Sequence, residues 1–123
     1  MALNINNTAK LPRWKHITVW VLQILAAAAF FMAGGSKLAG AEKMVTLFTE
    51  IGLGQWFRYL TGSLEVIGAL LILFPRTAFL GGTLLASIMI GGVITHLFIV
   101  GGSIIPATVL FAITATVAYL RKA

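Results

Sequence analysis

Four ionisable residues stand in or beside apolar stretches, and their types suit proton transfer or the binding of a polar group. Glu65 is the one carboxylate in "YLTGSLEVIGALLILF", and His96 lies in "MIGGVITHLF". Lys37 ends the stretch "FFMAGGSK", and Arg58 precedes the stretch around Glu65. An ionisable side chain inside an apolar span is costly and marks a functional site by default. Glu65 is therefore the first candidate for chemistry, with His96 and Lys37 beside it, while Arg58 marks the outer end of the second span.

The composition places these residues in a membrane. Of 123 residues, 59% are hydrophobic and 10% are charged, and the mean hydropathy of +1.00 exceeds what a solvated surface allows. The net charge of +6 then serves to orient the chain in the bilayer and does not indicate nucleic acid. The absence of cysteine excludes disulfide exchange, thiolate nucleophiles and cysteine-held zinc or iron–sulfur clusters supplied by this chain alone.

Four apolar stretches predict membrane-spanning helices, against the ~20 residues that a span needs. The expected fold is all-α, a polytopic membrane protein with an antiparallel four-helix transmembrane bundle in one domain, 1–123. Proline and glycine separate the stretches, so the connections on either side of the third one are short. The predicted spans cover residues 17–35, 57–74, 77–100 and 104–120.

The long connection between the first two spans predicts a short amphipathic helix over residues 41–51. Met44, Leu47, Phe48 and Ile51 recur at the spacing of one helix face, and Gly52 suits the helix end. Two interpretations are open. The helix lies in the lipid interface, or it forms a lid over the outer end of the bundle.

The basic residues predict the orientation. The side that holds both termini collects six of them and the other side three, so both termini are expected in the cytoplasm of a bacterial-type inner membrane. A cleaved signal peptide is the competing interpretation, but the first apolar stretch is longer than the usual ~7–15-residue signal core. The six are Lys10, Arg13, Lys15, Arg76, Arg121 and Lys122, and the three are Lys37, Lys43 and Arg58.

The candidate residues gather near the outer end. At a rise of ~1.5 Å per residue, Glu65 lies about 10 Å below Arg58, and His96 lies about 8 Å below Gly101. Lys37 reaches the same half from the first span. Small residues occupy the positions three and four away from Glu65, which indicates that this carboxylate faces another helix.

Each candidate also has a structural interpretation. Glu65 can act as an acid or merely hydrogen-bond two helices, and its charge state is open because desolvation opposes what a nearby cation favours. His96 is either a structural histidine or a partner for a ligand oxygen. Lys37 extends towards water unless it pairs with Glu65. Arg58 and Arg76 are expected to meet lipid headgroups.

The segments "GGSKLAG", "LGQWFRYLTGSLEVIGALLILFPRTA" and "MIGGVITHLF" resemble the DoxX-like family of small four-helix membrane proteins. Lys37, Arg58, Glu65 and His96 match positions where that family carries the same residue types. The resemblance implies these four as ligand-binding residues. The family is named after a membrane subunit linked to quinone-dependent sulfur oxidation, so the resemblance also implies a redox-linked role.

Three functions remain open. In the first, the chain binds a quinone or similar amphiphile in an outer-side pocket, and the electrons come from a partner protein. Alternatively, it is a structural or assembly subunit of a larger membrane complex or a homo-oligomer. An exporter is the third hypothesis, although one copy of four helices leaves little room for alternating access. Catalytic residues are not identified, and one histidine with one glutamate offers too few ligands for a metal.

Overall fold

The computed structural model describes residues 12–122, so Lys10 lies outside the described residues. Within this range the chain is all helical, with four long helices, one short one and a π-helical turn. The long helices are α2, α4, α5 and α6, α3 is the short helix, and η1 is the π-helical turn that continues α5. The elements are α2 (Arg13–Ala39), α3 (Glu42–Ile51), α4 (Gln55–Leu73), α5 (Ala78–Thr95), η1 (His96–Val100) and α6 (Ile105–Arg121).

The helix ends follow from local chemistry. Gly40 and Gly52 end α2 and α3 in the left-handed conformation, with φ of 75° and 85°, which costs glycine no Cβ clash. Pro75 follows the end of α4, and Pro106 stands in the first turn of α6, where its missing N–H is tolerated. Helix α2 extends beyond the predicted 17–35 at both ends.

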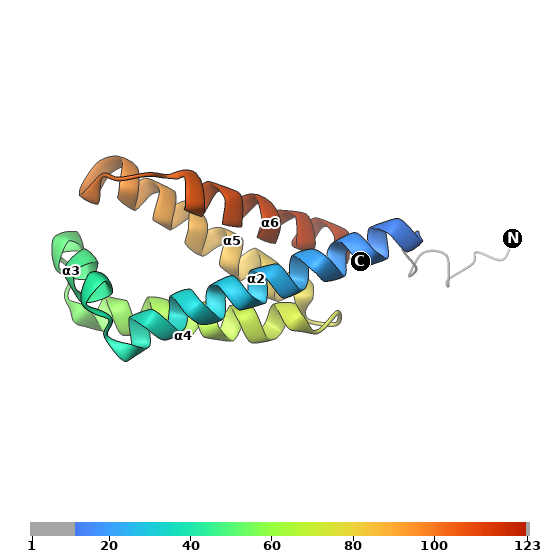
Figure 1. The fold of residues 1–123 in the computed structure, drawn as a ribbon, viewed down its shortest axis with the longest axis horizontal. Coiled ribbons are helices and arrows are strands. Elements are labelled where there is room, and N and C mark those ends of the chain that lie inside the picture. The colour runs from blue at the N-terminus through green and yellow to red at the C-terminus, as the bar shows by residue number, and fades with distance from the viewer. Residues whose placement is uncertain (1–11, 123) are drawn as a thin grey trace, which may run out of the picture.

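The long helices associate in pairs along their length. Helix α2 packs mainly on α4, α5 packs mainly on α6, and α4 joins the two pairs through α5. Figure 1 shows the pairs close together near the termini and apart at the other end, where α3 lies. Helices α2, α4 and α5 with η1 are long and apolar enough to cross a membrane, and α6 is a shorter apolar helix.

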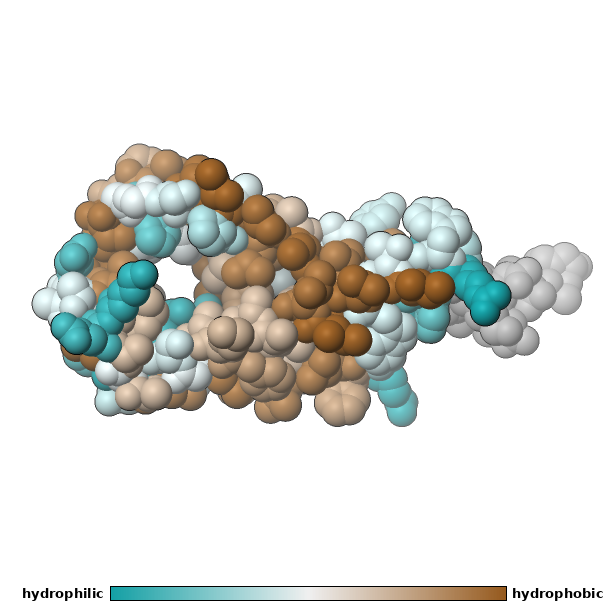
Figure 2. Space-filling model, in the orientation of Figure 1, coloured by the Kyte–Doolittle hydropathy of each residue, from teal (hydrophilic) through white to brown (hydrophobic). Residues whose placement is uncertain are grey.

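The core is densest towards the terminal end. Val19, Phe30, Ile72, Leu85 and Val117 are fully buried there and along the middle of the bundle. Exposed side chains on the outside of the long helices are mostly large and apolar, as Figure 2 shows by their brown colour. A water-soluble fold would bury such residues, and a lipid-facing surface does not need to.

Gln23 is a buried polar residue near the terminal end. Its side chain is fully buried, and its Nε2 donates to the carbonyl oxygen of Ile72 over 2.8 Å. Arg121 Nε donates to Gln23 Oε1 over 3.0 Å. One amide therefore ties α2 to both α4 and α6, and a buried amide without such partners would be costly.

Candidate functional site

A cavity of about 420 Å³ lies at the wide end of the bundle, between α2, α4, α5, α6 and α3. The opening at the α3 end in Figure 2 marks the same region. Its walls are mainly apolar, with Phe30, Leu64, Met89 and Leu110 among them. The polar residues that line it are few, and they include three of the predicted candidates. These polar residues are Lys37, Thr61, Glu65, Thr95 and His96.

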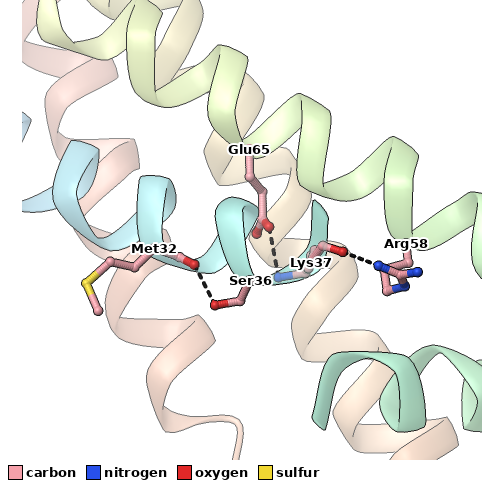
Figure 3. A network of polar contacts seen from close by, with 5 residues as sticks. All are labelled: Met32, Ser36, Lys37, Arg58 and Glu65. Carbon is pink, nitrogen blue, oxygen red and sulfur yellow. Dashed lines mark hydrogen bonds and ion pairs between the residues drawn. The ribbon is translucent and has the colours of Figure 1, made fainter. Parts of the chain in front are cut away.

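An ion pair between neighbouring helices stands in the cavity wall. Lys37 Nζ on α2 lies 2.8 Å from Glu65 Oε1 on α4, and the two side chains are 13% and 2% exposed. Figure 3 shows the carboxylate pointing across from α4 to the lysine. The contact is an electrostatic attraction between opposite charges, because Oε1 accepts no hydrogen bond of good geometry from the described residues. Lys37 therefore pairs with Glu65 and does not extend to water.

Two glycines allow this pair to form. A Cβ on Gly34 would lie 2.8 Å from the carbonyl oxygen of Gly62, and one on Gly62 would lie 2.9 Å from Lys37 Cβ. The backbones of α2 and α4 thus approach as closely as small residues permit. The prediction that Glu65 faces a neighbouring helix is confirmed, and its neighbour is α2.

Arg58 has a different place from the one predicted. Its side chain is 5% exposed, donates from Nε to Gln55 Oε1 over 2.6 Å and donates from Nη1 to the carbonyl oxygen of Lys37. The expectation that Arg58 meets headgroups is wrong, because the carbonyl oxygens in the last turn of α2 attract a cation and one of them accepts from this guanidinium. Arg58 does not line the cavity, and it fixes the helix end that carries Lys37 (Figure 3).

His96 stands where α5 changes to the π-helical turn. Its Nδ1 lies 2.7 Å from the carbonyl oxygen of Gly101, five residues along the chain. The third span was predicted as one regular helix over 77–100, and the structure divides it at this residue. Such π turns interrupt regular helices at functional sites more often than elsewhere. The imidazole lines the cavity together with Glu65 and Lys37, as their similar depth predicted.

Helix α3 covers the outer end of the cavity. Leu47, Phe48 and Ile51 line the cavity, and Phe48 is 4% exposed. A second, outer cavity of about 930 Å³ lies between α3 and the turn from η1 to α6, and it is bordered by Glu42, Lys43, Glu50 and His96 among others. The structure thus favours the lid interpretation of this helix, with His96 bordering both spaces.

Sequence reasoning missed several parts of the site. Thr61 and Thr95 line the cavity, but hydroxyl residues are too common in helices to attract notice. Gln23 carried a usable signal, since it is the one amide in the apolar stretch of α2. Among residues 12–122, no three histidine, aspartate, glutamate or cysteine side chains lie close enough together to hold a metal ion.

Comparison with known proteins gives two findings. Residues 21–120 match the DoxX-like family. A protein of Bacillus subtilis (strain 168), named "Putative oxidoreductase CatD", is 33% identical over 80 residues. The aligned part makes up 65% of this chain and spans about 60% of that relative. No solved structure matches the chain.

Proposed function

The chain belongs to the DoxX-like family, and we propose that it is a multi-pass membrane protein in which the cavity lined by Lys37 and Glu65 binds a quinone or a similar amphiphile. The observation that carries this proposal is the Lys37–Glu65 ion pair, which opens onto an otherwise apolar cavity that His96 also lines. Small-molecule pockets typically have volumes of about 300–1,000 Å³ and a few placed polar groups, and the cavity of about 420 Å³ meets both conditions. A quinone matches such a cavity, because it carries polar oxygens on an otherwise apolar ring.

The bilayer placement follows from helix lengths and charge. We propose four antiparallel spans, with the 17 residues of α6 covering about 26 Å of a hydrocarbon core of ~30 Å. The end that holds Arg13, Arg76 and Arg121 would face the cytoplasm. Of the basic residues expected at the opposite end, Lys37 is paired and Arg58 is buried, which leaves Lys43 as the exposed one within the described range. The difference between the two ends in exposed basic residues is therefore proportionally larger than the six-to-three difference in all basic residues.

The redox role rests on the family and on the name of the relative. The bacterial relative carries the name "Putative oxidoreductase CatD", and a link to quinone-dependent oxidation is what the resemblance to the family implies. In this proposal the chain supplies the binding site and a protein partner exchanges electrons with the bound ring. The alternative is an assembly subunit, in which the ion pair only joins α2 to α4.

A cavity-filling variant tests the proposal. The purified protein in lipid nanodiscs is titrated with duroquinone, and binding is followed by the quenching of tryptophan fluorescence. Gly92 lines the cavity, and a Cβ there would meet only Ala107 Cβ at 3.7 Å, so Gly92→Leu should fold and abolish saturable binding. Gly35→Leu is the matched control, because a Cβ at Gly35 meets open space outside the cavity lining. Equal binding by both variants would place the ligand elsewhere.

A further inference from the structure

The hydrogen bond of His96 fixes the tautomer of its ring. A carbonyl oxygen only accepts, so the Nδ1 that lies 2.7 Å from the carbonyl oxygen of Gly101 must carry a proton. Whenever the imidazole is neutral, its other nitrogen, Nε2, is then a bare acceptor. No described residue donates a hydrogen bond to Nε2. Since the backbone makes the Gly101 contact, the assignment does not depend on a neighbouring side chain.

The other polar groups of the cavity supply both acceptors and donors. Thr95 donates its hydroxyl proton to the carbonyl oxygen of Gly91 over 2.8 Å, so its oxygen can only accept from a ligand. Glu65 offers carboxylate oxygens, and the ammonium of Lys37 faces one of them and has further N–H donors. The hydroxyl of Thr61 is free to act in either sense. Among these lining residues a ligand therefore meets donors at Lys37 and Thr61, and acceptors at His96, Thr95 and Glu65.

We propose that His96 makes the cavity selective for the reduced, hydroxyl-bearing form of its ring ligand, by accepting a hydrogen bond from that hydroxyl at Nε2. This inference rests on the proposed function and names the form of the ligand that the same cavity prefers. A quinone carbonyl has no proton to donate, so against Nε2 it would bring two lone pairs together in an apolar cavity and leave both unpaired. A hydroquinone or other phenol hydroxyl pairs with Nε2 directly.

The histidine is held where the helix ends. The π turn runs from His96 to Val100, and Gly101 follows it with a φ of 74°, so the carbonyl oxygen that His96 Nδ1 contacts lies just beyond the last helical residue. The imidazole is thereby held by the backbone at the border between the inner and outer cavities. The turn acts as a positioning device, and Nε2 is the atom left for the ligand.

A pair of redox-stable probes tests the selectivity. We use 4-heptyloxyphenol and its methyl ether, which differ in the presence of the donating hydroxyl, at about pH 8, where an imidazole is ordinarily neutral. The wild-type protein in nanodiscs should bind the phenol about tenfold more tightly, the effect of one well-formed hydrogen bond. His96→Phe should reduce this preference to near unity, and His96→Gln, whose amide both donates and accepts, should bind both probes. Phe98→Leu, which changes an exposed neighbour, should retain the preference.

The nitrogen resonances of the histidines give a readout that needs no variant. The chain has two histidines, and His16 is exposed on α2 at the end away from the cavity. With ¹⁵N-labelled histidine, His96 should show a protonated Nδ1 and an unprotonated Nε2, and the phenol should shift the Nε2 resonance while His16 stays unchanged. A protonated Nε2 in the neutral ring would overturn the tautomer assignment.

The outcomes separate the two proposals. Equal affinity for both probes, unchanged in His96→Phe but abolished in Gly92→Leu, would overturn the selectivity and leave cavity binding intact. Absence of saturable binding of either probe, with no difference between Gly92→Leu and Gly35→Leu, would overturn the cavity as a ligand site and the selectivity with it. A higher affinity for the methyl ether than for the phenol would overturn the selectivity, because it would show that the cavity offers a donor where we place an acceptor.

Discussion

Neutralising both members of the Lys37–Glu65 pair should cost less than neutralising one. The pair is 2.8 Å apart, with Glu65 2% and Lys37 13% exposed. Removing one partner of a fully buried pair costs about 3–5 kcal/mol. Since the long stem of Lys37 gives its head a route towards water, we expect about 2 kcal/mol each for Glu65→Gln and Lys37→Met. The double variant leaves no charge behind and should lose about 1 kcal/mol, close to an ordinary polar contact between membrane helices.

The assay is reversible unfolding in mixed micelles, followed by far-UV circular dichroism. The two single losses would sum to about 4 kcal/mol if they were independent, so the expected double loss corresponds to a coupling of about 3 kcal/mol. Lys43→Met is the control, because Lys43 is exposed and should change the free energy of unfolding by less than about 0.5 kcal/mol. Strictly additive losses would refute the ion pair. A stable double variant that no longer binds duroquinone would assign the pair to the ligand site.

The crossing of α2 and α4 makes Gly34 sensitive to one methyl group: Gly34→Ala should lower the free energy of unfolding by about 1–3 kcal/mol, and Gly35→Ala, which meets open space, should not. Equal losses in the same unfolding assay would mean that α2 and α4 do not cross at this point. Phe48→Ala removes a ring that is 4% exposed, at a cost of about 3 kcal/mol, so amide exchange should quicken in α3 and remain slow in the long helices. Unchanged exchange in α3 would show that this ring does not hold the lid. Reporter domains near Gly40 and at the C-terminus should be found on opposite sides of the membrane, and two reporters on one side would contradict the four-span arrangement.

The sequence predicted the features that follow from the spacing of apolar residues and from the free-energy cost of placing an ionisable side chain in an apolar span. The apolar stretches located the long helices, and the period of α3 gave its apolar face. Small residues around Glu65 indicated a close helix contact, which the approach of Gly34 to Gly62 confirms. Counting residues along each span placed Glu65 and His96 at similar depth, and both line one cavity. Each inference used a quantity that is local to one helix.

The errors concern contacts between helices. Arg58 was expected at headgroups, because nothing in its own helix shows that the end of α2 presents the carbonyl oxygen of Lys37 beside it. The link from Gln23 to Arg121 joins residues 98 positions apart and needs the packed fold to be seen. The π turn from His96 to Val100 and the contact of His96 with the carbonyl oxygen of Gly101 were also missed, because residue propensities do not distinguish a π turn from a regular helix.

Glycines on one helix close the bundle at one end and leave it open at the other. On α5, a Cβ at Gly81 would lie 2.6 Å from Ile72 N, and one at Gly82 would lie 2.8 Å from the carbonyl oxygen of Thr114. Further along the same helix, a Cβ at Gly92 would meet nothing nearer than 3.7 Å. Empty volume in a packed interior forfeits dispersion contacts, so the open end carries a cost that the closed end avoids. A ring seated against Gly92 would restore those contacts and, by mass action, stabilise the folded chain, which makes ligand-dependent thermal protection the signature of a cavity kept open for an occupant.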